Sequence, residues 1–330
     1  MTEQKKMVPR FSANVNTFNA CADRYVLSGY GERLTVDQMI DAATKVEGLT
    51  GVEVVGLWHV NDDTVEHVNR RVKDAGLEVT CVTPDIWAQA KWGKGSFASN
   101  DPAIRRAAIQ EVKKSMEWAK QMNCEVVDLW FGQDGFDYPF QADYIANWQR
   151  IIEGTIECAE HLPEIKIVIE YKPKEPRTHC HIGTVGNTLL LLSQVNKPNV
   201  GAMIDVGHAL MAYENTAESA ALLQHFGNKL FYMHFNDNWR LWDDDLTVGS
   251  VHTIELIELV YWLDRMNYTG WYALDIFPYR ENGVRAATES IKWIQGAQRL
   301  VEKMGRENIA QVIATGDALT ASAMLREAIF

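Results

Sequence analysis

The feature that most constrains the fold is an eightfold alternation of strand-like and helix-like segments. Apolar, β-branched runs typical of buried strands occur at residues 10–17, 51–58, 78–87, 124–130, 166–172, 200–206, 230–235 and 270–276. Segments typical of helices follow in turn at residues 35–46, 62–75, from 101 onward, 143–162, 184–194, 217–226, 252–266 and 286–304. Repeated strand–helix units of this kind predict a parallel sheet.

Eight such units in 330 residues predict an α/β fold, a single (β/α)8 TIM barrel. The alternative, a doubly wound sheet, needs a phosphate-binding turn or a switch-point site, and no G-x-G-x-x-G motif follows the first strand. We therefore expect one catalytic barrel domain over residues 1–304 and a short, weaker helical tail over residues 305–330.

The composition narrows the function classes. A formal net charge of −12 disfavours a surface for nucleic-acid phosphates or anionic lipids, and fits an enzyme for small molecules or a divalent-cation binder. The sequence has no run of about 18 apolar residues and no apolar stretch behind its N-terminal charges, so we expect neither a membrane span nor a signal peptide. Five cysteines without C-x-x-C spacing favour reduced thiols and a cytoplasmic protein.

Metal-capable side chains stand at the ends of successive predicted strands, where a TIM barrel places its chemistry. The run at residues 166–172 carries Glu170 and Lys172, which would point to the same side of a strand. Alone, this pair is equally consistent with a buried ion pair. The next three strands also end in metal-capable side chains: Asp205 with His208, His234, and Asp275. This repetition predicts a metal site.

The candidate ligands are mostly oxygens. Carboxylates suit Mg²⁺ or Mn²⁺, and the imidazoles extend the choice to Co²⁺. Asp243 and Asp245 follow the seventh strand, and with His208 they could form a second metal position beside the first. Taken alone, the run at residues 243–245 is more typical of a solvated acidic loop. Three strand ends carry indoles that could stack on a sugar face: Trp58, Trp87 and Trp130.

Together these features resemble the xylose isomerase family of TIM-barrel sugar isomerases and the related bacterial L-rhamnose isomerases. The resemblance covers residues 11–280 and rests on six stretches: Glu170-Tyr171-Lys172-Pro173-Lys174-Glu175-Pro176, Asp205-x-x-His208, Asp243-Asp244-Asp245, Asp275-x-x-Pro278, residues 96–101 and Trp130-x-Gly132-x-x-Gly135. Three positions depart from classical xylose isomerases. His234 stands in place of an aspartate and is closer to the rhamnose-type enzymes, Asn16 replaces a tryptophan, and Trp87 replaces a phenylalanine.

The resemblance implies a divalent-metal-dependent aldose–ketose isomerase that acts on a free monosaccharide by a 1,2-hydride shift. It implies two divalent cations per chain (Mn²⁺, Mg²⁺ or Co²⁺) and a homodimer or homotetramer, with no nucleic-acid or membrane partner. The structural cation would be bound by Glu170, Asp205, His234 and Asp275, and the catalytic one by Asp205, His208, Asp243 and Asp245. Lys172 would polarise the substrate carbonyl, His59 oriented by Asp62 would assist ring opening, and the substrate would contact Trp130, Trp87 and Asn16.

Three other functions stay open at this point. A sugar 3-epimerase or dehydratase on the same barrel resembles a single-metal site with paired glutamates, whereas the eighth strand here ends in Asp275 and a second-metal segment is present. An endonuclease of the same superfamily conflicts with the negative charge. A non-catalytic sugar- or metal-binding module is difficult to reconcile with both Lys172 and His59 at the strand ends.

Overall fold

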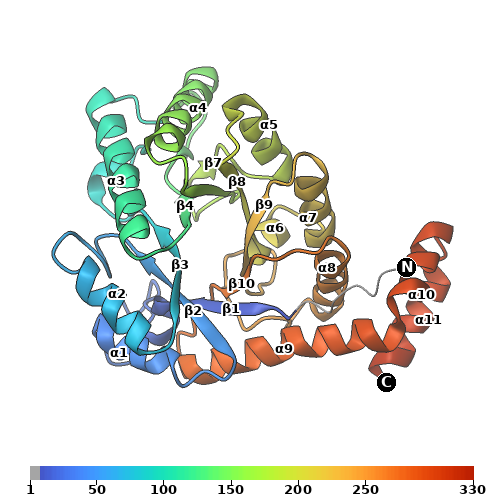
Figure 1. Cartoon of the computed structure of the whole chain (residues 1–330). Helices are drawn as coiled ribbons and strands as arrows, with labels where there is room; N and C mark the ends of the chain where they lie inside the picture. Colours follow the sequence, from blue (N-terminus) through green and yellow to red (C-terminus); the bar gives the residue numbers. More distant parts are fainter. Residues whose placement is uncertain (1–7) are drawn as a thin grey trace.

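Eight parallel strands form a closed barrel in the structure, a computed structural model that describes residues 8–330 (Figure 1). The strands are β1 (Arg10–Asn14), β2 (Leu49–Val55), β3 (Glu78–Thr83), β4 (Val126–Trp130), β6 (Lys166–Glu170), β8 (Val200–Asp205), β9 (Leu230–Phe235) and β10 (Trp271–Leu274). They neighbour one another in chain order, and β10 closes the ring by pairing with β1. The predicted TIM barrel is confirmed.

Helices surround the barrel (Figure 1). They are α1 (Val36–Ala43), α2 (Val65–Asp74), α3 (Pro102–Gln121), α4 (Tyr144–His161), α5 (Val185–Val195), α6 (Val206–Met211), α7 (Thr216–His225), α8 (Thr253–Arg265) and α9 (Gly283–Met304). Side-chain caps begin several of them: Thr35 forms a capping box with Gln38 on α1, and Asp101 and Asp143 accept backbone N–H groups on α3 and α4. These three caps stand where the sequence predicts helices to begin, near residues 35, 101 and 143.

The inside of the barrel is layered, and this layering positions the site. One set of inward side chains forms a separate apolar cluster of Cys81, Val126, Val168, Met203, Tyr232, Trp271 and Ala273. Side chains on a strand alternate between its two faces, so the residue two positions further along points inward again. On four strands, and directly after β10, that residue is a carboxylic acid or a histidine: Asp128, Glu170, Asp205, His234 and Asp275. The carboxyl end of the barrel interior is therefore polar and ionisable.

Several elements differ from the sequence-based expectations. The first predicted strand, residues 10–17, ends at Asn14 and continues as a 3-10 turn, η1 (Val15–Phe18). The fifth ends at Glu170, so Lys172 lies just beyond the strand. The short helix α6 was not predicted, nor was a two-stranded antiparallel sheet of β5 (Gly135–Phe136) and β7 (His179–Cys180). Elements this short contain too few residues to show a periodic pattern.

The predicted C-terminal tail consists of two helices, α10 (Arg306–Thr315) and α11 (Ala318–Ile329), at the end of α9 (Figure 1). A 3-10 turn, η2 (Ala90–Trp92), lies in the loop after β3. Within the part of the chain that the structure describes, no helix is both long and apolar enough to cross a membrane. The division of the chain at residue 305 into two domains stays a prediction.

Candidate metal and sugar site

A pocket of about 320 Å³ opens at the carboxyl ends of the strands. Its wall divides into two arcs. Strands β2 to β4 and the residues just after them contribute three indoles, Trp58, Trp87 and Trp130, whose neighbouring ring centroids lie 6.0 and 4.9 Å apart. Strands β6, β8, β9 and β10 and the segments that follow contribute most of the charged groups. A ligand in this pocket would therefore have an apolar wall on one side and an ionic wall on the other.

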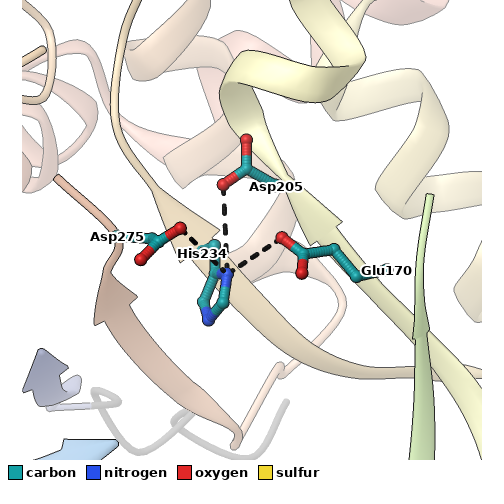
Figure 2. A group of neighbouring side chains, drawn as sticks. All are labelled: Glu170, Asp205, His234 and Asp275. Carbon is teal, nitrogen blue, oxygen red and sulfur yellow. Dashed lines mark hydrogen bonds and ion pairs between the residues drawn. The ribbon is translucent and has the colours of Figure 1, made fainter. Parts of the chain in front are cut away.

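The first ionic group consists of Glu170, Asp205, His234 and Asp275. Figure 2 shows three carboxylates converging on one nitrogen of the His234 ring. That nitrogen, Nδ1, lies 3.1 Å from Glu170 Oε1, 3.9 Å from Asp205 Oδ2 and 4.0 Å from Asp275 Oδ2. One ligand atom from each residue lies within 4.8 Å of all the others. The structure thus brings together all four residues assigned to the structural cation.

The second ionic group shares Asp205 with the first and adds His208 and Asp243. His208 Nε2 lies 3.0 Å from Asp243 Oδ2. Asp205 also caps α6 by accepting the His208 N–H at 2.9 Å, and this cap holds His208 beside Asp205. Asp245, the fourth expected ligand, lines the same pocket but lies outside this compact group, and Asn236 Nδ2 donates to its Oδ1 at 3.2 Å.

Both groups fit hard divalent cations. Asp243 Oδ1 and Asp275 Oδ1 are buried and, among residues 8–330, have no hydrogen-bond partner. A buried carboxylate oxygen of this kind requires a partner, and a cation supplies one. Burial, opposed by His234, raises the pKa of Asp275 to about 7, and burial raises the pKa of Asp205 to about 6. Mostly oxygen donors with two imidazoles suit Mg²⁺, Mn²⁺ or Co²⁺.

Lys172 lies at the junction of the two arcs. Its Nζ is 2.7 Å from Asp243 Oδ2, contacts Glu175, and lies 5.0 Å from the centre of the Trp130 ring. Burial lowers the pKa of Lys172, but the attraction of Asp243 and Glu175 outweighs burial and raises it well above its usual value. Lys172 therefore presents a permanent positive charge beside the second ionic group. Glu175, which fixes it, was not among the expected site residues.

The expected pairing of His59 with Asp62 is wrong. Asp62 accepts a hydrogen bond from Trp118 Nε1 at 2.8 Å and pairs with Lys114 Nζ at 2.7 Å. Both nitrogens of the His59 ring have other partners, the Val55 N–H and Asn16 Oδ1. The helix α2 starts only at Val65, so Asp62 belongs to an exposed turn that faces α3. Three-residue spacing on a loop does not fix where a side chain points.

Two buried acids of the site were missed. Glu53 on β2 accepts hydrogen bonds at both oxygens, from Tyr232 OH at 2.7 Å and from His234 Nε2 at 3.0 Å. Asp128 on β4 has a side-chain hydrogen bond to Glu170, and burial raises its pKa well above the usual value. Both lie inside strand-like apolar runs. A charged residue within such a run is unusual and could have identified both as site residues.

Comparisons with known proteins agree with this architecture. A family model described as a xylose isomerase-like TIM barrel matches residues 40–297. Xylose isomerase from Thermus thermophilus is 26% identical over 234 residues, which cover 68% of this chain and 60% of that protein. The chain therefore spans about 60% of the length of that relative.

Solved structures share the fold at low identity. A D-tagatose 3-epimerase-like protein superposes with a TM-score of 0.66 at 19% identity, covering 89% of this chain and 98% of its own. D-allulose 3-epimerase from Methylomonas sp. superposes with a TM-score of 0.68 at 14% identity, covering 87% of this chain and 96% of its own. The 3-keto-D-glucoside 4-epimerase from E. coli superposes with a TM-score of 0.67 at 15% identity, covering 87% of this chain and 98% of its own. At these identities the similarity establishes the fold alone.

Proposed function

Because this chain belongs to the family of xylose isomerase-like TIM barrels, we propose that it is a divalent-metal-dependent aldose–ketose isomerase acting on a free monosaccharide. One observation carries the proposal. Two groups of ligating side chains share Asp205, and Lys172 adjoins the second group at the point where the ionic arc meets the indole of Trp130. A 1,2-hydride shift needs both carbon-bound oxygens polarised and water kept away from the reacting carbons.

The side chains of this protein divide that work. Two bound cations, Mn²⁺, Mg²⁺ or Co²⁺, would supply Lewis acidity toward the oxygens on C1 and C2. Lys172 donates a hydrogen bond from its charged Nζ to the substrate carbonyl oxygen, where negative charge develops. Trp87 and Trp130 cover the opposite face of the sugar and exclude water, so that hydrogen moves between carbons without exchange.

The competing reaction is epimerisation at C3 by proton transfer. A proton must then leave one face of C3 and arrive at the other, which calls for acid–base groups on both sides of the sugar. In this pocket every lining carboxylate except Asp128 of β4 comes from the β6–β10 side, and the facing wall carries three indoles. This arrangement favours the isomerase, and the sugar 3-epimerase or a related dehydratase is the outcome against which it is tested.

The test begins with protein stripped by a chelator and reloaded with Mn²⁺, Mg²⁺ or Co²⁺. Each form is incubated in D₂O with pentoses, hexoses, 6-deoxyhexoses and branched sugars, and the products are identified by NMR. We expect cation-dependent conversion between an aldose and its ketose, with little deuterium at C1 or C2 because hydride moves directly.

Inversion at C3 with deuterium incorporated at that carbon would contradict the isomerase and show that the activity is 3-epimerisation. Turnover that survives complete removal of the cations would contradict the role given to both ionic groups. The untreated protein and the stripped protein without added cation are the two controls. Loss of water from the sugar, seen as a deoxy-keto product, would indicate the dehydratase.

A further inference from the structure

His59 has both ring nitrogens occupied by neutral partners. Its Nδ1 accepts the backbone N–H of Val55 at 2.9 Å, and its Nε2 lies 3.0 Å from Asn16 Oδ1. The same two residues are joined again, since the His59 N–H donates to Val55 O at 2.9 Å. His59 is only 5% exposed and lies behind Asn16, and it is Asn16 that lines the pocket.

These contacts determine where the ring proton resides. A nitrogen that accepts an amide N–H must present its lone pair, so Nδ1 carries no hydrogen. The single proton of the neutral ring is then on Nε2, which donates to Asn16 Oδ1. A second proton, on Nδ1, would face the N–H of Val55. Burial also lowers the pKa of His59 to about 4. The ring is therefore neutral at physiological pH.

The Asn16 amide is fixed by this contact. Its Oδ1 receives the His59 N–H, and its own backbone N–H donates to Asn14 Oδ1 at 3.1 Å in the turn η1. Within residues 8–330 its Nδ2 makes no hydrogen bond. Because Asn16 lines the pocket, an amide with two free N–H groups stands at the wall where a sugar would bind.

We propose that Asn16 binds the substrate by donating a hydrogen bond from Nδ2 to a sugar oxygen, and that His59 is a neutral positioning residue that holds the amide in this orientation. The inference rests on the proposed function, since it takes a sugar as the ligand. It reassigns His59, which the family resemblance places in ring opening, to a role without proton transfer. The sugar oxygen facing Asn16 must be an acceptor.

The tautomer is tested first, on the Mg²⁺-loaded full chain. Long-range ¹H–¹⁵N NMR distinguishes a protonated from an unprotonated ring nitrogen, and the His59 signals are assigned as those missing in His59→Gln. We expect an Nε2–H tautomer that does not titrate between pH 5 and 8. An Nδ1–H tautomer, or a titration in this range, would overturn the proposal.

The roles are tested by kinetics on the converted sugar. Asn16→Asp keeps an oxygen acceptor for His59 but has no N–H for the substrate, so we expect kcat/KM to fall about 10- to 100-fold, mainly through KM. His59→Gln retains an N–H at the position of Nε2 and should keep much more activity than His59→Ala, with an unchanged pH profile. If both His59 variants lose kcat equally and a limb of the pH profile disappears, His59 is an acid or base and the proposal fails.

The two proposals fail separately. If no sugar is converted, the isomerase is rejected, whereas the tautomer measurement still stands on the protein alone. Substrate contact is then tested by binding, with xylitol and sorbitol as open-chain probes and thermal shift as the readout. Weaker stabilisation of Asn16→Asp than of the unmodified chain supports the contact, and equal or absent stabilisation contradicts it.

Discussion

At the scale of single residues, Lys172 supplies the positive charge beside the second ionic group. Replacing it by methionine removes the cation between Asp243 and Glu175 while preserving most of the side-chain volume. We expect kcat to fall by at least about 100-fold because the substrate carbonyl loses its charged donor. Mn²⁺ binding should persist, because Lys172 belongs to neither group of candidate ligands.

The matched control is Lys174→Met, which removes a lysine from the same segment. Lys174 Nζ lies 5.3 Å from the centre of the Trp242 ring and, within residues 8–330, forms no ion pair with a member of either ionic group, unlike Lys172 Nζ. Its loss should leave kcat nearly unchanged. Normal turnover of Lys172→Met would disprove the assigned role. Loss of Mn²⁺ binding in that variant would show that Lys172 supports the structure of the site instead.

His59 makes a second prediction at this scale, on stability against pH. The pKa of His59 is about 4 in the folded chain and 6.5 in its usual state. Between pH 6.5 and 4 the unfolded chain therefore binds a proton at His59 that the folded chain does not bind. His59 therefore supports stability above pH 6.5, and about 3 kcal/mol of this is lost as the pH falls to 4. His59→Gln should lack that part of the acid limb, measured by urea unfolding at pH 7, 5.5 and 4. If the free energy of unfolding fell equally with pH in both proteins, the role given to His59 would be contradicted.

The sequence sufficed for those site residues whose position follows from strand alternation. Glu170, Asp205, His234 and Asp275 each lie two residues beyond an inward apolar residue. The same rule places Asp128, which was not among the site residues expected from the sequence. Asp62 was misplaced because its direction depends on a turn and on Trp118 and Lys114 of a distant helix. Long-range partners of this kind leave no local pattern.

At the scale of elements, the short helix α6 holds the second ionic group in place. Gly207, its second residue, has no room for a side chain: an added Cβ would lie 2.8 Å from Asn236 Oδ1 and 2.9 Å from Asn238 Nδ2. Asn236 in turn donates to Asp205 Oδ2 at 2.7 Å. Gly207→Ala should displace these groups and weaken Mn²⁺ binding about tenfold or more, measured by calorimetric titration.

Gly186→Ala is the corresponding control, because Gly186 is the second residue of α5 and an added Cβ would meet its nearest neighbour, Thr184 Oγ1, at an ordinary 3.7 Å. That variant should bind Mn²⁺ as the unmodified chain does. Equal affinities for both variants would show that α6 does not position the ligands. The contrast also explains why α6 escaped prediction, since tertiary contacts rather than periodicity define it.

At the scale of the whole molecule, acids outnumber bases at the carboxyl end of the barrel. Seven carboxyl groups, from Glu53, Asp128, Glu170, Asp205, Asp243, Asp245 and Asp275, gather around Lys172, His208 and His234. Cations that bind only the folded chain relieve this excess and stabilise it, by about 2.7 kcal/mol at a hundredfold excess over Kd. We expect Mn²⁺ to raise Tm and to bind with a stoichiometry of two per chain.

Neighbouring acids provide the control for that stoichiometry. Asp243→Asn should reduce it to one, whereas Asp244→Asn should leave two, because Asp244 accepts the Trp239 N–H at 2.9 Å and belongs to neither ionic group. A stoichiometry of one Mn²⁺ per unmodified chain would contradict the second cation site and favour the epimerase. The homodimer or homotetramer expected from the family resemblance stays a prediction.

The division of the pocket wall into an indole arc and an ionic arc has an evolutionary consequence. The loops after β2, β3 and β4 can exchange residues without altering a cation ligand, since both candidate ligand groups come from β6 onward. Selection for a new sugar can therefore act on one half of the barrel rim while the catalytic half is inherited intact. A library confined to residues 57–58 and 88–91 should change sugar preference more often than it destroys activity.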